Sequence, residues 1–199
     1  MEERELTLIT PFGAVSCTDF GPSDGNFVLC VQGKSANLDV VTEWFATARS
    51  LAEKGFHVVV PNLHSNEATK PGTQRFEDVS KILLSVIEHF QATTLILCGK
   101  SWGGGQATQF AAAFPQLIAR LVLVAPSVKA EEHPAKKIPG KPVQLFWARD
   151  DTVVSISNAQ AFVDSIDSSL LEFVTVDVGG HRILDDYLLN IVAFCSRAE

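Results

Sequence analysis

The sequence has few cysteines and no long hydrophobic run. Four cysteines are dispersed along 199 residues, and three of them lie in or near apolar stretches. They are Cys17, Cys30, Cys98 and Cys195. This pattern favours reduced, buried thiols over a disulfide or zinc framework. No apolar run approaches the ~18 residues that a transmembrane helix needs, and the acidic start, residues 1–5, lacks the apolar core of a signal peptide. We therefore expect a cytoplasmic protein without a membrane span.

A strongly basic tract is also absent. The formal net charge is −7, which argues against electrostatic binding to nucleic acid. Hydrophobic residues make up 46% and charged residues 20% of the chain, as in ordinary globular proteins. The length predicts a single domain over residues 1–199 with room for a substantial core. Nothing in the pattern specifies an oligomeric state.

The most informative segment is a glycine-serine pentad after a short apolar run. Residues 95–98 are typical of a buried strand, residues 99–103 have the pattern Gly-x-Ser-x-Gly, and the helix-like segment Gln106–Phe114 follows. A strand, a sharp turn and a helix are the context in which this pattern presents a reactive serine. Ser101 is therefore a candidate nucleophile.

The same segment also contains Gly-Lys-Ser, which occurs in phosphate-binding loops. That motif requires a further glycine five positions before the second one. Position 94 is Thr94, and a second Gly-Lys-Ser at residues 33–35 has Val28 at the corresponding place. Neither segment fits a nucleotide site.

A nucleophilic serine needs a base, and the base needs an orienting acid. His181 follows two glycines after a late strand-like run, so it can reach the same sheet edge as Ser101. The other histidines fit a structural strand position (His57), a loop beside the pocket (His64), a solvated helix end (His89) and a charged loop (His133). Asp150 and Asp151 follow the strand-like run Val143–Ala148, and the order Ser…Asp…His leaves either one as the acid.

These features together resemble the α/β-hydrolase superfamily, from about residue 5 to about residue 197. The resemblance rests on residues 99–103, on the acid segment 149–154 and on Gly179-Gly180-His181. In that family a short residue and then apolar ones typically follow the acid, as they do after Asp151, so the resemblance favours Asp151 over Asp150. It also implies an oxyanion hole made by the backbone N–H groups of Trp102 and Lys34. The family often has His-Gly-x before the second donor, whereas this chain has Gln32 in place of the histidine.

The rest of the chain alternates strand-like and helix-like segments. This alternation predicts an α/β fold with a mostly parallel central sheet of about eight strands and helices on both faces. The expected strands are 6–10, 14–18, 27–31, 57–60, 95–98, 121–124, 143–147 and 170–176. The expected helices are 38–54, 75–90, 106–114, 156–166 and 183–194. The interval Ala125–Lys141 is too short for a cap domain, so we expect an open cleft rimmed by Pro61–Gly72 and Ser127–Pro139.

The sequence thus predicts a serine hydrolase that cleaves carboxylic esters or thioesters through an acyl-enzyme intermediate. Its substrate would be a small-molecule or carrier-bound acyl group, and no metal or organic cofactor is required. Lys34 would place a positive charge near the site, unless it is a solvated surface residue, and Trp102 would either wall the pocket or simply pack beneath a loop. The alternative is a non-catalytic binding or interaction protein on the same fold.

Overall fold

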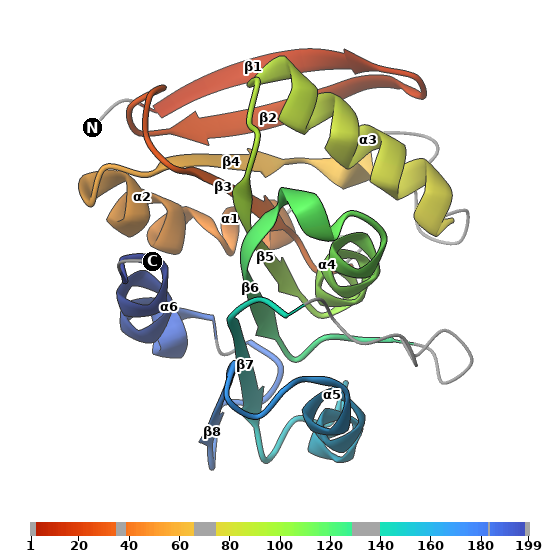
Figure 1. The fold of residues 1–199 in the computed structure, drawn as a ribbon, viewed down its shortest axis with the longest axis vertical. Helices are drawn as coiled ribbons and strands as arrows, with labels where there is room; N and C mark the ends of the chain where they lie inside the picture. Colours follow the sequence, from red (N-terminus) through yellow and green to blue (C-terminus); the bar gives the residue numbers. More distant parts are fainter. Residues whose placement is uncertain (1–2, 35–38, 66–74, 129–139, 183, 198–199) are drawn as a thin grey trace.

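The computed structural model describes residues 3–34, 39–65, 75–128, 140–182 and 184–197. Its strands form one eight-stranded sheet in the order β1-β2-β4-β3-β5-β6-β7-β8 (Figure 1). The strands are β1 (Glu3–Thr10), β2 (Gly13–Phe20), β3 (Phe27–Val31), β4 (His57–Pro61), β5 (Leu95–Lys100), β6 (Ile118–Val124), β7 (Val143–Ala148) and β8 (Leu171–Val176). β2 pairs antiparallel with β1 and with β4, and every other neighbouring pair is parallel. The expected mostly parallel sheet is confirmed.

Helices cover both faces of this sheet. The helices are α1 (Asp39–Thr42), α2 (Phe45–Glu53), α3 (Phe76–His89), α4 (Trp102–Ala113), α5 (Ala159–Ser165) and α6 (Leu188–Cys195). Short 3₁₀ turns are η1 (Leu63–Ser65), η3 (Pro115–Leu117), η5 (Ile156–Asn158) and η6 (Asp185–Tyr187). α3, α4 and α5 pack on one face, and α2 and α6 pack on the other (Figure 1). None of the described helices is long and apolar enough to cross a membrane.

The central strands are buried on both faces, which explains their uninterrupted apolar sequences. In β3, Phe27, Leu29 and Val31 face the cluster under α3 and α4, whereas Val28 and Cys30 face the cluster under α2 and α6. Successive side chains of a strand point to opposite faces, so a strand covered on both sides needs apolar residues at every position. The period-two alternation of a half-exposed strand is therefore missing here.

Four of the expected helices differ from the sequence expectation, and one of them, 156–166, is the 3₁₀ turn η5 followed by α5. The segment expected as one helix from about residue 38 to 54 is divided into α1 and α2 by Trp44, whose fully buried indole donates a hydrogen bond to the carbonyl of Val31 at 3.3 Å. α4 begins at Trp102 rather than at Gln106, because the glycines at 103–105 belong to the helix. The last expected helix is a 3₁₀ turn followed by α6.

Among the loops that the parallel strands bring to one edge of the sheet are the four that carry the predicted site residues. The loops after β3, β5, β7 and β8 all leave the carboxyl ends of parallel strands. In open α/β sheets, ligand sites lie outside these carboxyl ends. The predicted nucleophile, acid, histidine and oxyanion-hole residues therefore all belong to loops at the same edge.

Candidate active site

The turn after β5 holds Ser101 in a backbone conformation that non-glycine residues rarely adopt. Its φ is 54° and its ψ is −121°. Such a conformation costs about 1–3 kcal/mol and persists only where the surroundings enforce it. A Cβ added at Gly103 would lie 2.3 Å from the carbonyl oxygen of Gln32 and 2.4 Å from that of Val31. Only glycine allows the start of α4 to pack this closely against the end of β3.

The backbone of Ser101 is fixed to the end of β6. Its N–H donates to the carbonyl of Val124 at 2.9 Å, and its carbonyl accepts from the N–H of Ser127 at 2.8 Å. A second donor to the same carbonyl is the N–H of Gly105 in α4, at 3.1 Å. These bonds hold the turn from both sides and do not involve the Ser101 hydroxyl.

The hydroxyl of Ser101 lies in a hydrogen-bonded chain with His181 and Asp151. The Nε2 atom of His181 is 2.8 Å from the Oγ atom of Ser101, and its Nδ1 atom is 2.7 Å from Oδ2 of Asp151. The Asp151 side chain is fully buried, while the His181 side chain keeps 18% of its surface exposed. A carboxylate can only accept, so the ring nitrogen that faces Asp151 carries the proton. Nε2 is then the acceptor for the serine hydroxyl.

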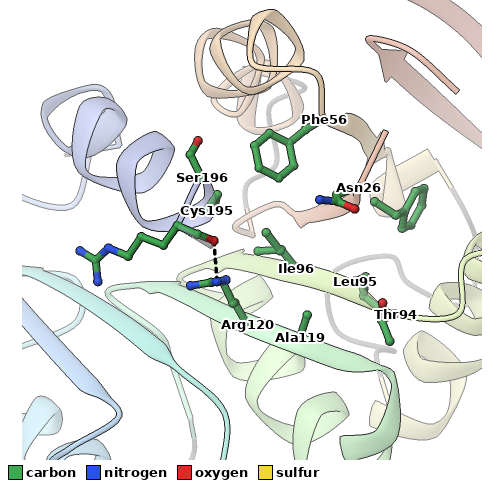
Figure 2. Close-up of a pocket in the computed structure, with 11 residues that line it drawn as sticks. Asn26, Phe56, Thr94, Leu95, Ile96, Ala119, Arg120, Cys195 and Ser196 are labelled. Carbon is green, nitrogen blue, oxygen red and sulfur yellow. Dashed lines mark hydrogen bonds between the residues drawn. The ribbon is translucent and has the colours of Figure 1, made fainter. Parts of the chain in front are cut away.

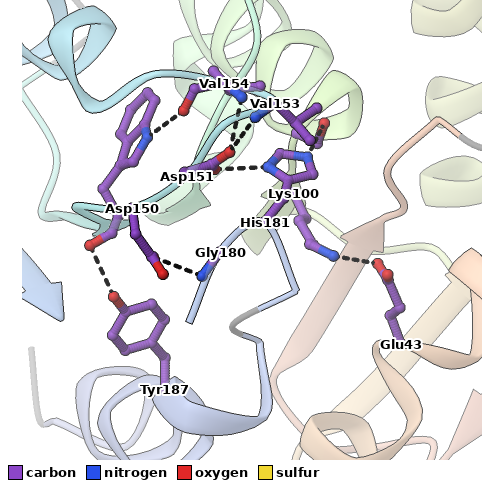
Figure 3. A network of polar contacts seen from close by, with 11 residues as sticks. Glu43, Lys100, Asp150, Asp151, Val153, Val154, Gly180, His181 and Tyr187 are labelled. Atoms are coloured by element: carbon purple, nitrogen blue, oxygen red, sulfur yellow. Dashed lines mark hydrogen bonds and ion pairs between the residues drawn. The ribbon is translucent and has the colours of Figure 1, made fainter. Parts of the chain in front are cut away.

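The orientation of the Asp151 carboxylate is set by its own turn (Figure 3). Its Oδ1 atom accepts the N–H groups of Val153 and Val154, each at 2.9 Å. The indole of Trp147 donates to the carbonyl of Val154 at 2.8 Å, and the hydroxyl of Tyr187 donates to the carbonyl of Trp147 at 3.0 Å. Burial raises the pKa of Tyr187 to about 12, so its hydroxyl remains a donor. The turn is therefore connected to β7 and to the segment before α6.

Asp150, the other acid that the sequence left open, does not contact the His181 ring. Its carboxylate accepts the N–H of Gly180 at 2.8 Å and that of Gly179 at 3.3 Å. The N–H of Gly180 lowers the pKa of the Asp150 carboxyl, and the N–H of Gly179 acts in the same direction. The two neighbouring acids thus contact different parts of the histidine loop.

The predicted oxyanion-hole loop passes directly beside the serine. A Cβ added at Gly33 would lie 3.5 Å from the Cβ of Ser101. Gln32, which replaces the expected histidine, is fully buried, and its Oε1 atom accepts the N–H of Leu63 at 3.4 Å. This bond connects the loop that carries Lys34 to the 3₁₀ turn after β4. The N–H of Trp102 belongs to the first turn of α4, where backbone donors lack helical partners.

His64, Trp102 and Lys34 lie close together near the nucleophile turn. The ring centroids of His64 and Trp102 are 5.9 Å apart. Burial, and then the charge of Lys34, lowers the pKa of His64, so the imidazole is neutral at pH 7. Trp102 also packs against the core, while Lys34 is exposed. The two segments predicted to rim the cleft are Pro61–Gly72 and Ser127–Pro139. Their residues 66–72 and 129–139, with His133, lie outside the described residues.

Two other histidines lie where the sequence suggested. His57 is buried, and its Nε2 atom is 2.9 Å from Oδ1 of Asp19, so it has a structural position in β4. His89 is exposed at the end of α3. Neither residue contacts the Ser101–His181–Asp151 chain.

Sequence reasoning missed the ion pair beside the nucleophile. Lys100 precedes Ser101, and its Nζ atom lies 2.7 Å from Oε2 of Glu43, with only 3% of the lysine side chain exposed (Figure 3). Lys100 follows Ile96 and Cys98 at two-residue spacing, so it points to the face under α2. A lysine at the end of an apolar strand is the available signal, because a buried ammonium needs a partner.

One cavity in the part of the chain that the structure describes lies apart from the serine. This cavity of about 530 Å³ is lined by residues such as Asn26, Thr94, Arg120 and Cys195 (Figure 2). Asn26 and Thr94 precede β3 and β5, so this cavity lies at the amino-terminal edge of the parallel strands. Ser101 is at the opposite edge, and we assign no role in the site to this cavity.

The sheet order, the strained serine turn and the helical layers together define an α/β-hydrolase architecture. A family model described as the alpha/beta hydrolase fold matches residues 26–140, which is more than half of the chain. The chain therefore belongs to the α/β-hydrolase fold family.

Relatives by sequence cover part of the chain. A putative non-heme haloperoxidase of Mycobacterium phage D29 is 29% identical over 90 residues, which are 44% of this chain and 32% of that protein. An uncharacterized protein of Mycobacterium tuberculosis is 34% identical over 105 residues, which are 50% of this chain and 29% of that protein. The matched segments thus span about a third of the length of these curated relatives.

Solved structures match nearly the whole chain at low identity. A structure described as a predicted CIB-like hydrolase of Thermoplasma acidophilum has a TM-score of 0.84 at 16% identity, with 98% of both chains covered. The thioesterase domain of the curacin biosynthetic pathway has a TM-score of 0.79 at 15% identity, with 98% of this chain and 99% of that chain covered. Naproxen esterase of Bacillus subtilis has a TM-score of 0.78 at 12% identity, covering 98% and 92%. At these identities the likeness shows the fold.

Proposed function

We propose that the protein is a serine hydrolase that cleaves carboxylic ester or thioester bonds through Ser101, His181 and Asp151. The observation that carries the proposal is the hydrogen-bonded chain from the Ser101 hydroxyl through both ring nitrogens of His181 to the buried Asp151 carboxylate. A serine with such a base and orienting acid meets the requirements for nucleophilic catalysis. Membership of the α/β-hydrolase fold family supports the same chemistry.

The proposed reaction begins when Ser101 attacks the acyl carbonyl and His181 takes its proton on Nε2. Asp151 stabilises the imidazolium that forms. The negative charge on the carbonyl oxygen is stabilised by the backbone N–H groups of Trp102 and Lys34, which we propose as the oxyanion hole. His181 then returns the proton to the leaving alcohol or thiol. Water attacks the acyl-enzyme by the same route in reverse, which releases the acid and restores the Ser101 hydroxyl.

The proposed substrate is a small acyl ester or an acyl group on a thiol carrier. Residues 125–142 connect β6 to β7, and an interval of this length does not accommodate a cap domain over the serine. An open site excludes water poorly, which suits reactive acyl groups that need no enclosed pocket. A thioesterase domain and a carboxylesterase among the structural neighbours support this substrate class.

Reaction with a fluorophosphonate tests the proposal directly. The probe forms a covalent adduct only with an activated serine, and the labelled peptide identifies the residue. We expect labelling at Ser101 and none in Ser101→Ala or His181→Ala, with turnover of short-chain esters and acyl thioesters falling on the order of 10⁶-fold in Ser101→Ala.

The same experiment separates the enzyme from the binding-protein alternative. A folded protein that takes up no probe and turns over no ester or thioester would contradict the proposal. If Ser101→Ala also kept the biological effect of the protein, a non-catalytic interaction role would replace the hydrolase.

A further inference from the structure

Beyond the ends of β7 and β8, the acid turn and the histidine loop continue to contact each other residue by residue. The last paired residues are Ala148 and Val176. The N–H of Arg149 then donates to the carbonyl of Val176 at 2.8 Å. Asp150 comes next and contacts the two glycines before His181, and Asp151 contacts His181 itself. Beyond the last backbone pair, the side chain of Asp150 therefore continues the hydrogen bonding between the two loops.

The geometry around the Asp150 carboxylate is that of an anion bound by consecutive backbone donors. The N–H groups of Gly179 and Gly180 point to its two oxygens, at 3.3 and 2.8 Å. Gly180 has a φ of 59°, in the left-handed region that favours glycine. Successive N–H groups in such a bend form a concave site for a negative charge. The carboxylate fixes the backbone of the loop immediately before the histidine.

Little else holds this stretch of the loop among the described residues. Val178 is 79% exposed, and a Cβ added at Gly180 would meet no atom within 4 Å. The neighbouring ion pair of Arg149 with Asp177 is at the surface, where such pairs contribute little. Because the Val178 side chain is exposed and Gly180 has none, hydrogen bonds of the loop backbone contribute to the position of His181.

We propose that Asp150 is a positioning residue that holds the histidine loop so that His181 stays aligned between Ser101 and Asp151. This role is distinct from that of Asp151, which contacts the imidazole. The proposal rests on the proposed hydrolase function for its kinetic consequence but not for its structural one. A displacement of about 1 Å in a catalytic group can lower the rate roughly 10²-fold. Loss of Asp150 therefore lowers kcat while the fold is retained.

The test compares Asp150→Ala with Asp177→Ala. Both variants remove one exposed carboxylate from the same pair of loops, but only Asp150 accepts the glycine N–H groups. We expect kcat for a short-chain ester to fall roughly 10- to 100-fold in Asp150→Ala, with KM little changed and with unaltered kinetics in Asp177→Ala. Asp150→Asn keeps one amide oxygen as acceptor, so it recovers part of the loss.

Proton NMR of the Nδ1–H group of His181 adds a readout that does not depend on turnover. A proton shared with a carboxylate resonates far downfield, and we expect this signal in the unaltered protein and in Asp177→Ala, but broadened or lost in Asp150→Ala. If the unaltered protein proves inactive yet shows this pattern, the hydrolase proposal fails and the positioning role stands. Unchanged kcat and an unchanged signal in both Asp150→Ala and Asp150→Asn would overturn the positioning role.

Discussion

Replacing Asp151 by asparagine tests the proposed division of roles within the site. One oxygen of Asp151 accepts two backbone N–H groups, from Val153 and Val154, and the other faces Nδ1 of His181. In Asp151→Asn the amide oxygen keeps the two backbone donors, so the NH₂ group is turned toward His181. The ring must then accept at Nδ1 and carry its proton on Nε2, where it cannot take the proton of Ser101.

The size of the effect follows from this change of tautomer. A histidine held in the wrong tautomer lowers kcat about 10⁴-fold in serine proteases, which corresponds to about 5 kcal/mol of transition-state stabilisation. We expect a loss of this order in Asp151→Asn with the geometry of the turn preserved. The assay is steady-state hydrolysis of a short-chain ester, together with the rate of fluorophosphonate labelling at Ser101. Asp150→Asn serves as the matched control, and we expect a far smaller loss there. Near-normal activity in Asp151→Asn, with Asp150→Asn inactive, would refute the assignment of the acid.

Two further predictions concern the surroundings of the serine. Gly103→Ala would place a methyl group 2.3–2.4 Å from the carbonyl oxygens of Gln32 and Val31. We expect this clash to lower the free energy of unfolding by about 1–3 kcal/mol. Thermal denaturation measures the loss. Lys34→Met should raise the pKa of His64, because the lysine charge disfavours the imidazolium. Burial, which is the larger cause of the lowered value, still keeps the pKa of His64 below 6.5. An NMR titration of His64 measures this shift.

Each of these predictions has a control within the chain. A Cβ at Gly33 meets its nearest atom at 3.5 Å, an ordinary contact, so Gly33→Ala should change stability little. Equal stability of Gly103→Ala and the unaltered protein would mean that the turn is less tightly packed than described. For the histidine, Lys54→Met removes a lysine at the end of α2, and it should leave the pKa of His64 unchanged.

The lowered pKa of His64 also fixes the sign of a pH effect. The unfolded chain takes up this proton near pH 6.5, whereas the folded protein takes it up only at lower pH. The unfolded state therefore binds more protons between these two values, and the free energy of unfolding falls as the pH drops below 6.5. Lys34→Met should make this fall smaller, and an equal slope in both proteins would contradict the interpretation.

Local patterns in the sequence predicted most of the fold and the main residues of the candidate site. Uniformly apolar runs such as residues 121–124 predicted buried parallel strands, because both faces of those strands are covered. The pentad around Ser101 and the order of Asp151 and His181 pointed to side chains that the structure brings within hydrogen-bond distance. Such features can be recognised in a sequence because a sharp turn and a strand end each require particular residue types. Their catalytic roles remain proposals.

Contacts between distant segments were not predictable in the same way. Trp44, beside the interruption of the expected helix, donates to the carbonyl of Val31, and the partner of Lys100 is Glu43; both partners are far away along the chain. The separate role of Asp150 depends on how the loops after β7 and β8 lie against each other. Residue type indicates that a buried lysine or indole needs a partner, but only the three-dimensional arrangement determines which one.

At position 101, the residue that would stabilise the fold best differs from the residue that the proposed reaction needs. With a φ of 54°, glycine would fit this turn with less strain than serine. A library selected for thermal resistance alone would therefore accumulate glycine at position 101 and lose the hydroxyl. Directed evolution of this protein for stability therefore needs a simultaneous selection for turnover. In any stabilised variant, residue 101 should be sequenced before activity is assumed.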